Sequence, residues 1–297
     1  MRFSIDEEFL CSADAEGREK MKEKLIKKHG QIRESVIARS ILSRPIEAYF
    51  IGEGRKYITV FAAHHALESI TTNIAFLLID FILQKSADGR LNDIDCKLLL
   101  SKYCFLIVPC VNPDGVELRF HGVSDSLLKE RQMRMSGGNF TTWQANARGV
   151  DLNHNYDSGF SEYKRLEAER GIAPGATLYS GEYPESEPET RGAANLVRSL
   201  MPCAVVSLHT QGEEIYAQPG SRKTIRQAER LALLMGYRTA TPEGTSAYGG
   251  LCDYTGSIGI PSFTLELGKG QNPLSERDVP EIFSRVGEAI ALLPTIL

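Results

Sequence analysis

The sequence has no uninterrupted hydrophobic run long enough to cross a membrane. Its longest apolar stretch, AFLLIDFIL, is interrupted by Asp80 and is much shorter than the roughly 20 residues that a transmembrane helix needs. Residues 1–20 also lack the apolar core of a signal peptide. We therefore expect a soluble, cytoplasmic protein that has no membrane partner.

A strong charge of one sign is also absent. The formal net charge is −4 and the pI is about 5.9, which argues against nucleic acid as a partner. The six cysteines form no CxxC pair, and most of them lie in apolar runs. We expect reduced core residues rather than a disulfide framework.

Short β-rich runs alternate with longer helical patterns, and there is no internal repeat. The expected strands cover 35–42, 46–52, 57–63, 103–111, 203–209, 214–218 and 262–267. The expected helices cover 16–29, 67–86, 187–200, 222–236 and 279–293. This alternation predicts a mostly parallel sheet with helices on both faces.

Two local patterns add detail. Ser186 and Glu189 form an S-x-x-E pattern, which predicts a capping box at the start of the helix near 187. The stretch 112–185 is rich in Gly, Asn, Asp and Pro and has no long apolar period. We interpret this stretch as a long functional loop region.

A histidine and a glutamate follow the apolar run 57–63. His65 and Glu68 are three residues apart, so at the start of a helix their side chains point to one place. Ligands bind outside the carboxyl ends of strands in open α/β sheets. The alternatives are a surface His and Glu, or His64 as the ligand in place of His65.

Two further strand ends carry polar side chains. His209 ends one apolar run and Glu266 lies between two leucines in another. Two imidazoles and one carboxylate are the ligand set of an open zinc site, and burial would raise the pKa of Glu266 towards that of a general base. The alternatives are a hydrogen-bonded structural His209 and an edge-strand Glu266 that faces water.

The polar motif NARGVDLNHNYD spans 146–157. Arg148, Asp151, Asn153 and His154 are close together there with little apolar material. The motif is either an Asx-rich turn or a source of groups that orient a metal-bound imidazole and bind a substrate carboxylate.

Taken together, HALE, CVNPDGVE, WQANARGVDLNHNYDSGF, SLHTQGEEIYA and FTLELGKGQNP resemble the zinc metallocarboxypeptidase family. They are most similar to its bacterial branch of γ-D-glutamyl-diaminopimelate peptidases. The resemblance implies a single catalytic domain over 1–297. Its fold would be an α/β/α sandwich around a mixed, mostly parallel eight-stranded sheet.

The resemblance also implies roles for individual residues. His65, Glu68 and His209 match the ligands of one Zn²⁺ per chain. Glu266 matches the general base that deprotonates the zinc-bound water and passes the proton to the leaving amine. Two more residues match supporting positions: Asp151 orients a ligand histidine, and Asn153 binds the substrate's terminal carboxylate.

The sequence departs from the family at three positions. His154 replaces a carboxylate-binding arginine, and histidine is charged only below about pH 6.5. The oxyanion-stabilising arginine falls near Gln144, which has no charge, so Arg148 or Arg134 would replace it.

The third departure is the family's mobile tyrosine. Thr245 stands at its ungapped position, and Tyr248 is close enough to serve. After the Gly-Gly pair come two plausible pocket residues, Cys252 and Asp253. Asp253 would either bind a substrate ammonium or stabilise a turn.

The resulting hypothesis is a zinc amidohydrolase for small peptides derived from peptidoglycan, cleaving the γ-D-glutamyl–diaminopimelate amide. A carboxypeptidase for ordinary peptides is the alternative enzyme. A non-catalytic binding protein of the same fold is the alternative outside catalysis. The oligomeric state is not predicted.

Overall fold

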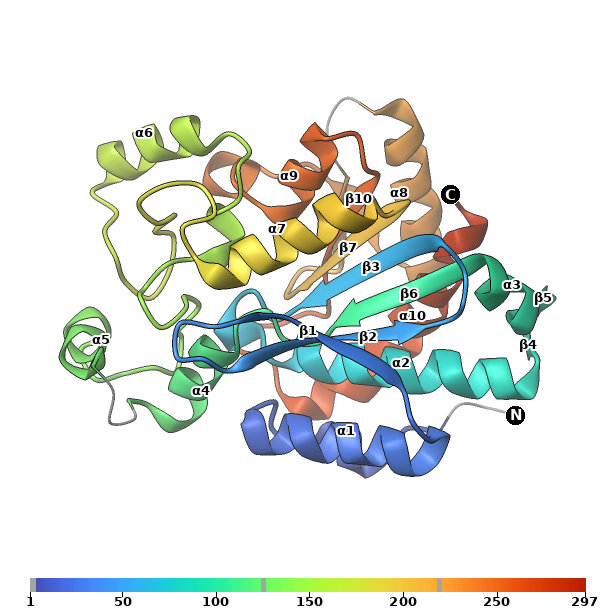
Figure 1. Ribbon diagram of the computed structural model, residues 1–297. Coiled ribbons are helices and arrows are strands. Elements are labelled where there is room, and N and C mark those ends of the chain that lie inside the picture. The colour runs from blue at the N-terminus through green and yellow to red at the C-terminus, as the bar shows by residue number, and fades with distance from the viewer. Residues whose placement is uncertain (1–3, 124–126, 218–220) are drawn as a thin grey trace.

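Eight strands form one mixed sheet at the centre of the computed structural model, which describes residues 4–123, 127–217 and 221–297 (Figure 1). The strand order is β1-β2-β6-β3-β7-β10-β8-β9. Four neighbouring pairs are parallel and three are antiparallel. The predicted mixed, mostly parallel eight-stranded sheet is therefore confirmed.

The strands of this sheet are β1 (Arg33–Arg39), β2 (Pro45–Ile51), β3 (Lys56–Ala62), β6 (Tyr103–Val108), β7 (Ala204–His209), β8 (Glu214–Ala217), β9 (Arg238–Ala240) and β10 (Ser262–Glu266). A small hairpin pairs β4 (Arg90–Leu91) with β5 (Ile94–Asp95). The helices are α1 (Ala15–His29), α2 (Ile70–Asp88), α3 (Cys96–Lys102), α4 (Pro113–His121), α5 (Lys129–Ser136), α6 (Phe160–Arg170), α7 (Pro188–Leu200), α8 (Arg222–Met235), α9 (Leu251–Ser257) and α10 (Val279–Ala291). Gln218, the last residue of one expected strand, lies outside the described residues.

Helices cover both faces of the sheet. Residues of α1, α2, α8 and α10 pack with one face in the larger apolar cluster, and residues of α7 and α9 pack with the other (Figure 1). By length and composition the α2 helix could cross a membrane, but 72% of its most apolar 18-residue stretch is buried inside the protein. Its Asp80 carboxylate binds Lys28 and His29 of α1, so α2 is a core helix of the domain.

The prediction that 112–185 is a long loop was wrong. The structure places α4, α5 and α6 in this stretch. The α4 helix begins after Asn112, whose side chain accepts a hydrogen bond from the Gly115 amide. Of the residues in α5 only Gln132 is buried, and α6 buries three. Because these two helices bury so few residues, their sequences lack the apolar periodicity from which a helix is predicted.

The predicted capping box at the start of α7 was also wrong. The N-cap residue is Glu187, and its side chain makes no capping hydrogen bond. Ser186 instead contacts Asn155 and the Glu187 carboxylate, while Glu189 accepts a hydrogen bond from the Ile41 amide. Tertiary partners have therefore displaced the local cap.

Three adjacent parallel strands end at the same edge of the sheet. The β7 strand lies between β3 and β10 and runs parallel to both. Residue pairing sets Ala62 beside Leu208, and His209 beside Glu266. The segments that follow β3, β7 and β10 therefore meet at one place, and the candidate site lies there.

Candidate metal centre and active site

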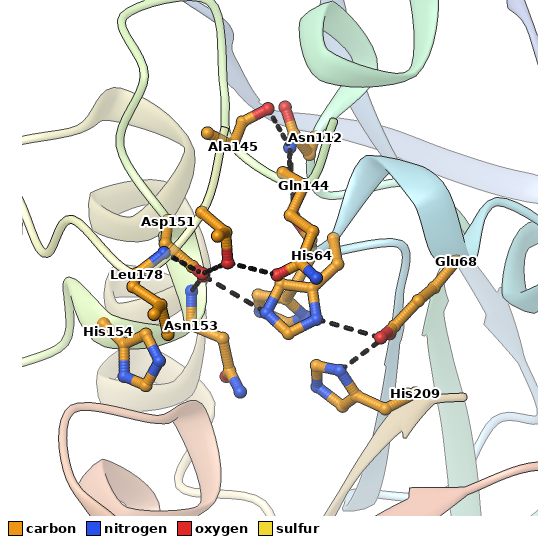
Figure 2. Close-up of polar contacts among 12 residues, drawn as sticks. His64, Glu68, Asn112, Gln144, Ala145, Asp151, Asn153, His154, Leu178 and His209 are labelled. Carbon is orange, nitrogen blue, oxygen red and sulfur yellow. Dashed lines mark hydrogen bonds and ion pairs between the residues drawn. The ribbon is translucent and has the colours of Figure 1, made fainter. Parts of the chain in front are cut away.

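His65, Glu68 and His209 form a group that could hold a metal ion. The Nδ1 atom of His65 lies 3.1 Å from Oε1 of Glu68, and Nδ1 of His209 lies 3.0 Å from Oε2 of Glu68. The candidate ligand atoms of all three residues lie within 4.8 Å of one another. Figure 2 shows the His209 ring and the Glu68 carboxylate pointing toward each other.

The path of the chain after β3 brings His65 and Glu68 to the same side. Ala63 has a positive φ of 52°, which turns the chain out of the strand, and its amide donates to Thr71 Oγ1 at 2.9 Å. His65 then caps a short 3₁₀ turn over Ala66–Glu68. This turn places Glu68 three residues from His65 on one face.

The contacts of the two imidazoles bear on which ring nitrogens carry a hydrogen. Nε2 of His65 lies 3.1 Å from Oδ1 of Asp151. A carboxylate only accepts, so Nε2 carries a hydrogen, and a neutral His65 ring has its lone pair on Nδ1, facing Glu68. Nε2 of His209 lies 3.0 Å from the Ser207 hydroxyl, which can donate or accept, and Nδ1 of His209 is hydrogen-bonded to Oε2 of Glu68 at 3.0 Å.

In a neutral His65 ring the Nδ1 lone pair would face the ionised Glu68 carboxylate, which is repulsive unless a proton or a metal ion lies between them. Nδ1 of His65 is buried and has no hydrogen-bond partner of good geometry among the described residues. Two imidazole nitrogens and one carboxylate are the donor set of catalytic zinc sites. The residues therefore fit a zinc ion with a position left open for water or substrate.

Asp151 holds the His65 ring in this orientation. Its carboxylate is 1% exposed and accepts from the Leu178 amide at 3.0 Å (Figure 2). It also accepts from Thr177 Oγ1 at 3.3 Å and from His65. Burial opposes ionisation of Asp151, but the nearby His65 and these hydrogen bonds hold its pKa well below the usual range. Asp151 is therefore an ionised acceptor at neutral pH.

Charged neighbours also shift the pKa values of the candidate ligand residues. Burial alone would lower the pKa of His65, but the Glu68 and Asp151 carboxylates raise it well above the usual range. Burial likewise opposes ionisation of Glu68, and the two imidazoles lower its pKa to about 2. The site is thus arranged around a positive charge, whether a proton or a metal ion carries it.

Glu266 lies in the same cavity but outside the group of candidate ligands. It ends β10 beside His209 of β7. Burial, followed by the nearby Glu68 carboxylate, raises the pKa of Glu266 to about 8. A carboxylate whose pKa lies close to neutral pH is suited to general acid and base catalysis.

A cavity of about 230 Å³ opens over these groups. Its lining residues are His65, Asn153, His154, His209, Gln211, Tyr216, Ala217, Pro242, Ser246, Gly250, Cys252, Asp253, Thr264 and Glu266. The space is small and polar, which suits a short peptide rather than a large apolar ligand.

Comparison with known proteins places this arrangement in a family. The family model for zinc carboxypeptidases matches residues 19–247, which is most of the chain. The chain belongs to the zinc carboxypeptidase family. The match ends before Glu266, so that residue rests on the geometry described above.

One relative in this family is the γ-D-glutamyl-L-diamino acid endopeptidase 1 of Lysinibacillus sphaericus. It is 32% identical over 83% of this chain, and the chain spans 63% of that relative's length. Murein peptide amidase A of Escherichia coli K12 is 33% identical over 35% of this chain and 34% of its own. The structure also resembles the solved structure of bovine thrombin-activatable fibrinolysis inhibitor. The two chains are 21% identical and superpose with a TM-score of 0.75 over 97% of each chain. This last comparison establishes the fold.

Among the predicted substrate-binding residues, three line the cavity: Asn153, His154 and Asp253. The ring of His154 stacks on Tyr163, with centroids 4.2 Å apart and an interplanar angle of 13°. Nδ1 of His154 lies 2.9 Å from the carbonyl oxygen of Tyr248. The histidine that replaces the family's arginine is therefore fixed by packing rather than mobile.

The structure does not bring the two candidate arginines to the cavity. Arg148 lies beside Glu187, with Nε 3.0 Å from Oε2, and Arg134 is an exposed residue of α5 that lies 3.8 Å from Glu130. Gln144 is also absent from the cavity lining; its Oε1 accepts from Thr177 Oγ1 at 2.6 Å. The expectation that Arg148 takes part in catalysis is not supported by this placement.

Tyr248 is likewise not among the residues that line the cavity. A Cβ on Gly159 would lie 2.7 Å from its ring, so the ring packs on the start of α6. The residue that reaches the cavity from this segment is Ser246. The ring direction in this structure depends on the packing of two loops, which the sequence pattern does not indicate, and a role for Tyr248 stays a prediction.

Several residues of the site were not predicted. Ser207 contacts His209, and Thr177 contacts both Gln144 and Asp151. The signal for Ser207 was present, because residues two apart in a strand share a face. Thr177 gave no comparable signal, since it lies in an irregular segment that only the tertiary fold brings to Asp151.

Proposed function

We propose that this chain is a zinc-dependent hydrolase that cleaves the amide between γ-D-glutamate and diaminopimelate in peptidoglycan-derived peptides. The observation that carries the proposal is the convergence of His65, Glu68 and His209 beside a half-buried Glu266 that is not among the candidate ligands. The named activity of the Lysinibacillus relative supports the choice of bond.

His65, Glu68 and His209 would hold the zinc ion. When bound, zinc supplies Lewis-acid polarisation of a carbonyl oxygen and lowers the pKa of water. The Asp151 carboxylate fixes the His65 tautomer and keeps its Nδ1 lone pair directed at the ion. Zinc therefore stands as one cofactor per chain in this proposal.

Glu266 would move the proton. Its carboxylate would accept a proton from the attacking water and then donate it to the nitrogen of the leaving diaminopimelate. Its raised pKa allows the carboxyl group to hold this proton between the two steps. Neither lysine nor arginine is available as a helper among the described residues that line the cavity.

The proposal is tested with the tripeptide L-Ala-γ-D-Glu-diaminopimelate and the zinc-loaded protein. We expect release of free diaminopimelate, detected by mass spectrometry, and no release in the presence of a chelator. A peptide with an ordinary α-linked C-terminal residue is the matched control and should be a poor substrate. Turnover of the control without release of diaminopimelate would identify an ordinary carboxypeptidase instead.

A further inference from the structure

One wall of the cavity is built by two segments that contact each other closely. The carbonyl of Tyr248 bonds His154, and the amide of Leu251 donates to Oδ1 of Asn153 at 3.2 Å. A Cβ on Gly250 would lie 3.0 Å from Oδ2 of Asp253 and 3.5 Å from Oδ1 of Asn153. The absence of a side chain at Gly250 thus keeps these polar groups open to the cavity.

His154 presents a hydrogen-bond acceptor on this wall. A carbonyl oxygen only accepts, so the contact with Tyr248 requires the hydrogen of His154 to be on Nδ1. Burial lowers the pKa of His154, although the Asp151 carboxylate opposes this effect. The ring is therefore neutral at physiological pH, and Nε2 has a free lone pair. No hydrogen bond to Nε2 occurs within the part of the chain that the structure describes.

Asp253 presents a second acceptor. Its Oδ2 accepts from the Gly250 amide at 3.1 Å, and within the described ranges Oδ1 has no hydrogen-bond partner. Burial raises its pKa to about 6, so the group is mostly ionised at pH 7. With no Lys or Arg in the described lining, the negative charge at this wall has no cationic side chain to balance it.

Asn153 differs from its neighbours because it presents a donor. An amide N–H can only donate, so the contact with Leu251 assigns the oxygen of Asn153 to that bond. The NH₂ group is then left for the cavity. The wall thus offers two acceptors and one donor, contributed by two segments that contact each other.

We propose that this wall is a subsite for the zwitterionic head of an amino acid. His154 Nε2 and the Asp253 carboxylate bind its ammonium group, and the Asn153 NH₂ group binds its carboxylate. The inference rests on the proposed function, because diaminopimelate carries such a head at the end remote from the scissile amide. It also reverses the expectation for position 154, where an arginine would bind a carboxylate alone.

The first test compares two substrates. One is the diaminopimelate tripeptide, and the other is the same peptide with 2-aminopimelate, which lacks only the remote ammonium. A hydrogen bond between charged groups contributes enough to predict a preference of roughly ten-fold or more in kcat/KM for the first peptide. Equal kcat/KM values for the two peptides would overturn the proposal.

Two variants distinguish binding of the substrate ammonium from a structural role of Asp253 at the start of α9. D253N keeps an acceptor for the Gly250 amide but loses the charge, and H154F keeps an aromatic ring against Tyr163 but loses Nε2 and the Nδ1 contact with Tyr248. Each should lower kcat/KM for the diaminopimelate peptide more than for the 2-aminopimelate peptide, so that the preference for the first peptide shrinks. D157N, at an exposed position outside the cavity lining, is the matched control. An equal fall for both peptides would mean that Asp253 acts only as a helix cap.

A binding experiment keeps this inference separate from the proposed activity. Calorimetric titration of the zinc-loaded protein compares free diaminopimelate with pimelate, which has both carboxylates and neither ammonium. We expect tighter binding of diaminopimelate and loss of that difference in D253N. This result without tripeptide hydrolysis would leave the subsite standing and reject the proposed function. Hydrolysis with equal binding of the two ligands would do the reverse.

Discussion

At the scale of single residues, the site depends on carboxylates placed in different surroundings. Asp151 and Glu68 face imidazoles and stay ionised, whereas Glu266 is half-buried beside Glu68 in a cavity whose described lining has neither Lys nor Arg. In the proposed mechanism the same functional group thus serves as an orienting acceptor, a ligand and a proton carrier. Environment rather than residue type separates these roles.

Glu266→Gln tests the proton carrier. We expect kcat to fall by roughly 10²- to 10⁴-fold, the usual contribution of general acid–base catalysis. Zinc content should not change, because Glu266 is not one of the three candidate ligand residues. Kinetics on the tripeptide and metal analysis of the same sample provide the two readouts. Loss of zinc along with activity would place Glu266 among the ligands instead.

Arg148→Gln tests an arginine that the sequence suggested for catalysis. Since its guanidinium contacts Glu187, we expect a loss of about 1 kcal/mol in the free energy of unfolding and less than a ten-fold change in kcat. Loss of an oxyanion donor would instead lower kcat by roughly 10²- to 10³-fold. Denaturant unfolding combined with steady-state kinetics separates the two roles.

At the scale of elements, α7 is attached to the rest of the molecule by buried carboxylates. Glu189 bonds the Ile41 amide just after β1 and lies 3.4 Å from the Asn146 side chain, and Glu187 bonds Asn146 and Arg148. These contacts tie the loop that carries Asp151 to the start of α7. Local sequence rules predicted a cap here because they do not include partners from distant segments.

Glu189 should also make stability depend on pH. Burial, together with the nearby Asp114 and Glu187 carboxylates, raises its pKa to about 8 from an ordinary 4.5. The folded state then binds more protons than the unfolded state between these values, so this group lowers stability as pH rises from about 5 to about 8.

Glu189→Gln should remove this dependence. We compare the free energy of unfolding of the variant with that of the wild type at each pH. This difference should favour the variant by roughly 1–3 kcal/mol more at pH 9 than at pH 5. Urea unfolding at both pH values measures the difference. Glu229→Gln, at an exposed position of α8, is the control and should show no such gain. A gain of the same size at both pH values would contradict the argument.

At the scale of the whole molecule, the sequence could predict the architecture because apolar runs mark the central strands. It could also locate His65, His209 and Glu266, since each follows or ends such a run and parallel strands end at one edge. The orientation of the Arg148 and Tyr248 side chains relative to the cavity could not be predicted. They depend on loop packing between segments that lie far apart in the chain.

Zinc should stabilise the whole domain, because its proposed ligands come from segments more than 140 residues apart and do not form a site in the unfolded chain. At a free zinc concentration 100 times the dissociation constant, the gain is about 2.7 kcal/mol. Thermal unfolding with and without a chelator should show this shift in Tm. His209→Ala should abolish the shift, and an undiminished shift in that variant would place the metal elsewhere.

The single tryptophan has a practical consequence. Trp143 is fully buried in a small apolar cluster with Ala63 and Ala66, which flank His65. The backbone carbonyl of the next residue, Gln144, accepts a hydrogen bond from the Ala66 amide at 3.0 Å. The indole is therefore a natural fluorophore next to the turn that carries His65 and Glu68, and its emission reports on that turn without any introduced label.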